Sequence, residues 1–131
     1  EKANSGLRGT YVEALAVSGT RVFAGTFANG VSVTFNNGQN WLPMNQGLSD
    51  PNVHALTVSG NNVYAGTSGG VFFSADLGQS WTPARAEPLP NTITALLVES
   101  GDLYAGTLGF GVFRSNNNGA SWTPASACKW P

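Results

Sequence analysis

Few side chains in this sequence have types and spacing that could support chemistry. Its 131 residues include seven carboxylates, six lysines and arginines, and one histidine. Cleavage of a glycosidic bond needs two carboxylates that face each other across a cleft, and only Glu13, Asp50 and Glu87 remain as members of such a pair. The lone His54 has no partner that the sequence identifies, so it gains no support as a general base. We therefore expect the protein not to be an enzyme.

Metal and cofactor chemistry has no better support. Cys128 is the only cysteine, so it cannot form an internal disulfide, and it has no metal-binding partner at a useful spacing. A calcium site would have to use Asn36, Asp76 and Asn117. Only Asp76 among them is charged, whereas hard cations usually take several carboxylates. We expect no metal and no cofactor.

Charge and hydropathy argue against two further classes of partner. The net charge is −1 and the basic residues are scattered along the sequence, which argues against nucleic acid. No run approaches the roughly 20 apolar residues of a transmembrane helix, so no membrane insertion is expected. Asn, Gly, Ser and Thr supply most of the polarity, as in turn-rich all-β proteins.

Asn36, Asp76 and Asn117 belong to three copies of an eight-residue box, at residues 34–41 (box 1), 74–81 (box 2) and 115–122 (box 3). Such side chains can accept hydrogen bonds from nearby backbone N–H groups in an Asx turn. A glycine two positions later supplies a positive φ, and the final tryptophan covers the apolar side of the turn. The residues that we interpret as structural are Asn36, Gly38 and Trp41, Asp76, Gly78 and Trp81, and Asn117, Gly119 and Trp122.

The elements that position the boxes are short strand-like runs, repeated about every 40 residues. We expect a first strand at 12–17, 53–58 and 93–98, in which recurring Ala-Leu pairs predict burial on both faces. A second strand at 22–26, 63–67 and 103–107 contains a glycine that predicts close packing between repeats. The third strand begins at Gly30, Gly70 and Gly111, and the fourth runs from the box tryptophan to Pro43, Pro83 and Pro124.

Four short antiparallel strands per repeat predict an all-β protein built of β-propeller blades. We expect residues 1–10 to be a connector remnant, 11–51 blade 1, 52–91 blade 2, 92–126 blade 3, and 127–131 a C-terminal tail. The connector interpretation depends on Gly6-Leu7, which precede blade 1 much as Gly47-Leu48 precede blade 2.

The boxes resemble the consensus Ser/Thr-x-Asp-x-Gly-x-Ser/Thr-Trp of the Asp-box, or bacterial neuraminidase repeat. Asn replaces Asp in boxes 1 and 3, and Asn40 replaces the second Ser/Thr. The resemblance covers residues 11–124, is strongest to regular secreted bacterial propeller arrays, and implies an extracellular or cell-surface location. It also implies that the boxes lie on a rim away from any active site. The arginine triad of sialidases does not carry over, because Arg21, Arg85 and Arg114 fall in different places of the repeat.

Three blades do not close a ring, because propellers typically have 4–8 blades. The two end faces would remain open, and we expect them to carry Val22 and Phe23 in blade 1 and Tyr104, Val112 and Phe113 in blade 3. Two hypotheses follow. The chain self-assembles, as a dimer with six blades or as a polymer, or it is part of a longer array. We favour self-assembly.

The side opposite the boxes carries residues that differ among the repeats and that could bind sugar or peptide. These are Phe27, Asn29, Asp50, Arg85, Glu87 and Phe110. Alternatively, Phe27 and Phe110 pack against neighbouring blades. His54 shares its repeat position with Glu13 and Thr94, which predicts a wet channel lining. The expected function is a non-enzymatic, secreted protein with a structural, self-assembling or adhesive role. The alternatives are a glycan-binding, lectin-like propeller and, less favoured, a fragment of a glycoside hydrolase.

Overall fold

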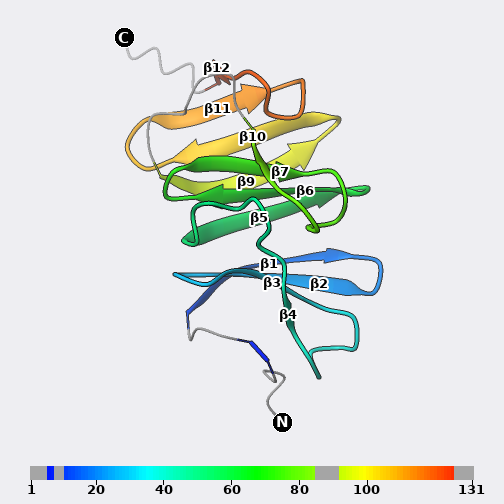
Figure 1. The fold of residues 1–131 in the computed structure, drawn as a ribbon. Coiled ribbons are helices and arrows are strands. Elements are labelled where there is room, and N and C mark those ends of the chain that lie inside the picture. Colours follow the sequence, from blue (N-terminus) through cyan, green and yellow to red (C-terminus); the bar gives the residue numbers. More distant parts are fainter. Residues whose placement is uncertain (1–5, 8–10, 85–91, 126–131) are drawn as a thin grey trace.

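Three copies of one four-stranded antiparallel sheet follow each other along the chain (Figure 1). This computed structural model describes residues 6–7, 11–84 and 92–125. Blade 1 comprises β1 (Val12–Ser18), β2 (Arg21–Thr26), β3 (Gly30–Thr34) and β4 (Leu42–Pro43); blade 2 comprises β5 (Val53–Ser59), β6 (Asn62–Thr67), β7 (Gly70–Ser74) and β8 (Thr82–Pro83); blade 3 comprises β9 (Ile93–Glu99), β10 (Asp102–Thr107), β11 (Gly111–Ser115) and β12 (Thr123–Pro124). The predicted all-β fold of four-stranded antiparallel blades is confirmed. Over the described ranges, no helix has the length and apolar character to cross a membrane.

The strands of each blade pair in chain order, so the first strand and the two-residue fourth strand form the two edges. The third strands begin at the predicted glycines, and the fourth strands end at the predicted prolines. The fourth strands begin one residue after the box tryptophan rather than at it. In blade 2 the reason is visible, because the backbone N–H of Trp81 donates to Gln46 O in the preceding connector (2.9 Å) instead of to the sheet.

A bulge interrupts the pairing of the first two strands in every blade. In blade 1 the register shifts between Val12 and Ala14, which leaves Glu13 as the extra residue. The extra residue is His54 in blade 2 and Thr94 in blade 3. A bulge re-aims a side chain out of the regular alternation of a strand. The repeat position that the sequence assigned to the channel lining (Glu13, His54 and Thr94) is therefore the bulge position in all three blades.

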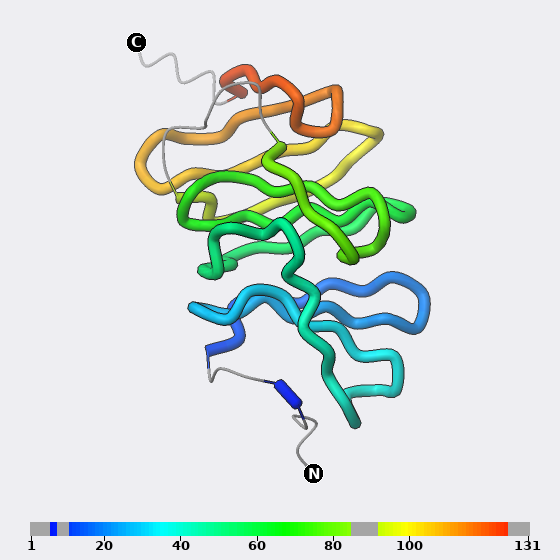
Figure 2. Tube along the Cα trace, viewed as in Figure 1, coloured from blue at the N-terminus to red at the C-terminus, as the bar shows by residue number. Residues whose placement is uncertain are grey.

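The core lies between blades rather than within them. β1 packs against β5 and β5 against β9, and blade 2 is placed between blades 1 and 3 (Figure 2). A Cβ added to Gly25 would lie 2.6 Å from Val53 Cγ1, and one added to Gly66 would lie 2.5 Å from Ile93 Cγ2. The predicted close packing at these glycines is confirmed. Core residues include Phe23, Val31, Val33, Val53, Leu56 and Trp81 at the first junction and Tyr64, Val71, Ala84, Ile93, Leu103 and Ala105 at the second.

Burial differs between the blades, and two predictions about it are wrong. The first strand is buried on both faces only in blade 2, where Leu56 is 8% exposed; its equivalent in blade 1, Leu15, is 65% exposed. Phe23, expected on an open end face, is fully buried because it faces blade 2. The open side of blade 1 instead carries Val12, Leu15 and Val17. Alternation assigns residues to two faces of a strand, but it does not say which face meets the neighbouring blade.

Candidate functional site

All three boxes form the same hydrogen-bonded turn. In box 2, Ser74 Oγ accepts from Gly78 N (2.7 Å) and donates to Asp76 Oδ1 (2.7 Å), which also accepts from Ser80 N (2.9 Å). Boxes 1 and 3 make the same bonds with Asn in place of Asp. The Ser74 hydroxyl, followed by the Ser80 hydroxyl, lowers the pKa of Asp76 to about 2. The structure thus forms the Asx turn that the sequence predicted.

Boxes 2 and 3 also join successive blades. Trp81 Nε1 donates to Met44 O of blade 1 (2.9 Å), and Trp122 Nε1 donates to Ala84 O of blade 2 (3.1 Å). Sequence reasoning gave these tryptophans a role only within their own blade. The signal that could have revealed the second role is the spacing of the two acceptors, since Met44 and Ala84 both directly follow the proline that ends the preceding blade's fourth strand.

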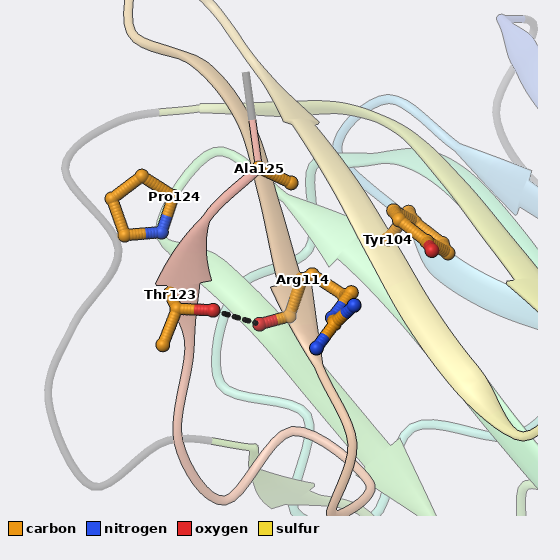
Figure 3. A pocket seen from close by; sticks show the side chains of 5 residues that line it. All are labelled: Tyr104, Arg114, Thr123, Pro124 and Ala125. Carbon is orange, nitrogen blue, oxygen red and sulfur yellow. Dashed lines mark hydrogen bonds between the residues drawn. The ribbon is translucent and has the colours of Figure 1, made fainter. Parts of the chain in front are cut away.

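Blade 3 repeats these contact positions without a further blade in the described structure. Val112 is 38% exposed, whereas its equivalents Val31 and Val71 are buried. Two other residues predicted for the open end faces, Val22 of blade 1 and Phe113 of blade 3, are half-buried. A cavity of about 370 Å³ opens on blade 3 (Figure 3), lined by Tyr104, Arg114, Thr123, Pro124 and Ala125.

The lining of this cavity has counterparts at the junction of blades 2 and 3. Tyr64 holds the equivalent position to Tyr104, and its Oη donates to Asn118 Oδ1 in box 3 (3.0 Å). Ala84, the equivalent of Ala125, accepts from the box 3 tryptophan. The cavity on blade 3 therefore lies where a further box would bind.

Blade 1 has a segment against its box that matches a connector. A Cβ added to Gly6 would lie 2.7 Å from Trp41 O, and one added to Gly47 would meet Trp81 O in the same way. The φ angles of these glycines are 84° and 86°. Gly6 therefore occupies on blade 1 the place that Gly47 occupies on blade 2. Residues 1–5 and 8–10 of the predicted connector, and 126–131 with the tail and Cys128, lie outside the described residues.

The bulge residues of blades 1 and 2 meet on the inner edge of the stack. His54 Nδ1 lies 2.7 Å from Glu13 Oε1, and His54 Nε2 lies 2.9 Å from Ser68 Oγ in the β6–β7 turn. The side chains of His54 and Glu13 are 20% and 37% exposed. The sequence identified no partner for His54, because both partners reach it only through blade stacking and a bulge.

The predicted ligand residues that the structure describes lie in turns and a connector. Phe27 and Asn29 lie in the β2–β3 turn and Phe110 in the β10–β11 turn, both on the side opposite the boxes (Figure 1). Phe27 is 46% exposed and Phe110 57%, so neither is buried against a neighbouring blade in this structure. The Phe27 ring contacts that of Tyr11 edge-to-face, with centroids 6.4 Å apart.

The three charged ligand candidates are less informative. Asp50 Oδ1 accepts from Asn52 N (3.0 Å), and Asp50 Oδ2 lies close to Gly69 in the β6–β7 turn. Asp50 therefore lies near the β6–β7 turn, but its hydrogen bond is made within its own connector. Arg85 and Glu87 lie outside the described residues.

Solved structures with a similar fold include enzymes and non-enzymes. An ancestral GH74 enzyme superposes with a TM-score of 0.77 at 22% identity, over 93% of this chain and 19% of that one. The extracellular domain of a putative hybrid two-component system from B. thetaiotaomicron gives 0.73 at 17% identity, over 88% and 17%. YCF48 bound to D1 peptide gives 0.66 at 16% identity, over 86% and 39%. At these identities the likeness concerns the fold alone, and this chain spans less than half of each of these structures.

A search of curated proteins found no match. The family model of the DUF6242 beta-propeller domain matches residues 10–131, which includes all three blades and their boxes. The stacked blades with short outer strands agree with that description. The chain therefore belongs to the DUF6242 beta-propeller domain family.

Proposed function

We propose that this chain is a structural propeller module that assembles blade to blade with a second copy of itself, a role that needs no enzymatic activity. The observation that carries the proposal is the open end of blade 3, where the cavity beside Tyr104 repeats a junction that the chain already uses twice. A box of the second copy would lie against this end as box 3 lies against Tyr64 of blade 2, since the cavity beside Tyr104 occupies the equivalent place. A dimer of this kind has six blades, within the usual range for propellers.

The opposite end of the stack supplies the matching surface. Val12, Leu15 and Val17 are 43%, 65% and 62% exposed, and their equivalents in blade 2 pack against blade 1. Apolar burial contributes about 25 cal/mol per Å², which opposes the entropy cost of association. The contact is head-to-tail, so it either closes into a ring or continues as a filament.

Light scattering on the native protein tests this proposal. A monomer has a mass of 13.6 kDa, and we expect a dimer or a larger species. Val112→Lys should dissociate the assembly, because it places an unpaired ammonium in the contact. Ser59→Lys, at the exposed end of β5, is the matched control and should leave the mass unchanged. A folded native monomer would overturn self-assembly and favour a longer array, in which the segment at Gly6 connects a preceding blade.

The finer identity of the boxes and the location of the protein belong to the same proposal. We take the boxes to be Asp-boxes of the bacterial neuraminidase repeat, supported by the shared hydroxyl, Asx, glycine and tryptophan turn. An extracellular location is supported by the extracellular domain among the similar structures. A glycosidase role has less support, since Glu13 is engaged with His54 and Asp50 with its own turn.

Ligand binding on the side opposite the boxes is a second candidate function. It is favoured by the exposure of Phe27 and Phe110, because exposed aromatic rings can stack on sugars or peptides, and one similar structure holds a peptide. A glycan array with the native protein is the test. Micromolar binding that is lost in Phe110→Ala would support it; the control is Phe35→Ala, which removes a ring that is 46% exposed in box 1. An array without any binding would count against glycans.

A further inference from the structure

His54 bridges a carboxylate and a hydroxyl in an order that is known from acyl-transfer chemistry. Glu13 comes from the bulge at the start of β1, His54 from the matching bulge of β5, and Ser68 from the β6–β7 turn. The distances are 2.7 Å from Glu13 Oε1 to His54 Nδ1 and 2.9 Å from His54 Nε2 to Ser68 Oγ. A nucleophile within hydrogen-bond reach of a base that a third group orients is the pattern of an activated serine.

The protons in this cluster have one consistent arrangement when the imidazole is neutral. An ionised carboxylate can only accept hydrogen bonds, so the contact with Glu13 requires the proton to be on His54 Nδ1. His54 Nε2 then carries a lone pair and accepts from the Ser68 hydroxyl. Glu13 therefore selects the tautomer in which His54 can take the proton of Ser68.

The position of Ser68 is held firmly while its side chain stays accessible. Its N–H donates to Asn52 O (3.1 Å), and the equivalent bonds hold Phe27 to Tyr11 O and Leu108 to Thr92 O (2.9 Å each). Ser68 is exposed. The equivalent residues in the flanking blades, Phe27 and Leu108, are also exposed, at 46% and 58%. The serine thus lies in the middle turn of three, with apolar side chains in the turns on either side of it.

We propose that Ser68 is a nucleophile that accepts acyl groups from esters with an apolar acyl chain, with His54 as its general base and Glu13 as the residue that positions His54. Ser68 Oγ bonds to the carbonyl carbon, its proton passes to His54 Nε2, and the C–O bond to the alcohol breaks as that alcohol takes the proton. Water then attacks the acyl-serine with His54 as base, which releases the carboxylic acid and restores Ser68. This activity goes beyond the assembly role and does not depend on it, since all three residues belong to one chain.

Steady-state hydrolysis of esters should be slow. A donor aimed at the developing oxyanion contributes about 10²–10³ in rate, but the N–H of Gly69, next to the serine, already donates to Thr67 Oγ1 (3.1 Å). General base catalysis alone contributes about 10²–10⁴. We therefore expect a covalent label to form readily and a steady state of ester hydrolysis to be weak.

The test is labelling of the native protein with an alkyl fluorophosphonate, followed by peptide mass spectrometry. We expect a single adduct on Ser68, no adduct in Ser68→Ala, and at least a roughly 100-fold slower reaction in His54→Gln. The matched control is Ser59→Ala, which changes an exposed serine at the end of β5, on the opposite side of the same blade, and should label at the native rate. Circular dichroism establishes that each variant is folded.

The variant Glu13→Gln distinguishes a role of Glu13 in positioning His54 from a purely structural role. It should lower the maximal labelling rate without changing the probe concentration that gives half of that rate, because Glu13 does not touch the probe. A folded native protein that takes no label would overturn the proposal, as would a label on another residue or a rate that His54→Gln leaves unchanged.

Discussion

Blade 2 and blade 3 share most of their strand pattern but have different surroundings. Val71 is 2% exposed in blade 2, whereas Val112, at the same position of blade 3, is 38% exposed. Tyr64 is buried and bonded to the next box, whereas Tyr104 lines an open cavity. The repeat specifies a four-stranded sheet locally, but each core is completed only by the blade that follows. Stability in such an array depends on the interfaces between neighbours as well as on the repeats themselves.

The largest difference between covered and open positions should appear at the box tryptophans. Trp81 is 3% exposed and its indole donates to blade 1, so Trp81→Ala should lower the free energy of unfolding by about 3–5 kcal/mol. Trp122 is only partly buried, so Trp122→Ala should cost less. Urea unfolding followed by circular dichroism measures both, at one protein concentration because assembly adds to apparent stability. Equal or reversed midpoints would contradict the comparison.

The strand glycines give a matched pair at a covered and an open junction. A Cβ on Gly66 would lie 2.5 Å from Ile93 Cγ2, whereas one on Gly106 meets nothing closer than Ala95 Cβ at 3.5 Å. Gly66→Ala should therefore cost about 1–3 kcal/mol through overpacking, and Gly106→Ala should be close to neutral in the monomer.

Assembly would change this result in an informative way. If a second copy covers blade 3 as blade 3 covers blade 2, the residue equivalent to Ile93 is Val12 of that copy, and it would meet the added methyl group of Gly106→Ala. The variant should then weaken association in light scattering while the unfolding midpoint of the monomer stays the same. A Gly66→Ala protein as stable as the native one would argue against tight packing between Gly66 and Ile93.

The repeat, the strands and the box turns could be predicted from the sequence because they depend on local patterns. The positions of Gly38, Gly78 and Gly119, for example, require a positive φ that the turn chemistry signals directly. The direction of stacking could not be predicted, and the expectation for Phe23 is wrong for that reason. The contact between Glu13 and His54 could not be predicted either, since it joins bulges 41 residues apart in the chain.

A smaller effect is expected at the tyrosine position that is covered in blade 2, as Tyr64, and open in blade 3, as Tyr104. Burial raises the pKa of Tyr64, so its hydroxyl remains a donor to Asn118 throughout the neutral range. Tyr64→Phe removes that hydrogen bond and should cost about 0.5–1.5 kcal/mol. Tyr104→Phe, at the open end, should cost less. Unfolding midpoints of the two variants that agree within error would show that the junction does not rely on this bond.

The smallest effect at neutral pH should come from Asp76→Asn in box 2. Boxes 1 and 3 already use Asn, and Asn117 Nδ2 donates to Ser121 Oγ (2.8 Å) where Asp76 Oδ2 accepts from Ser80 Oγ (2.7 Å). The serine hydroxyl can reverse its role, so the change should stay within about 0.5 kcal/mol, as for most surface substitutions. Urea midpoints at pH 7 measure this directly.

At acid pH, the stability of the native protein should differ from that of Asp76→Asn. The pKa of Asp76 is about 2 in the folded protein against an ordinary 3.8, so its ionised form stabilises the folded state above pH 4 or so, and that contribution is lost as the pH falls towards about 2. The amide in Asp76→Asn has no proton to gain, so this variant should lose less stability than the native protein across this window. Midpoints taken at pH 7, 4 and 2.5 should therefore diverge in the acid range, with the variant the more resistant. Parallel acid curves would mean that the bonds from Ser74 and Ser80 do not favour the carboxylate over its protonated form, and the box would then be a turn that tolerates charge rather than one that uses it.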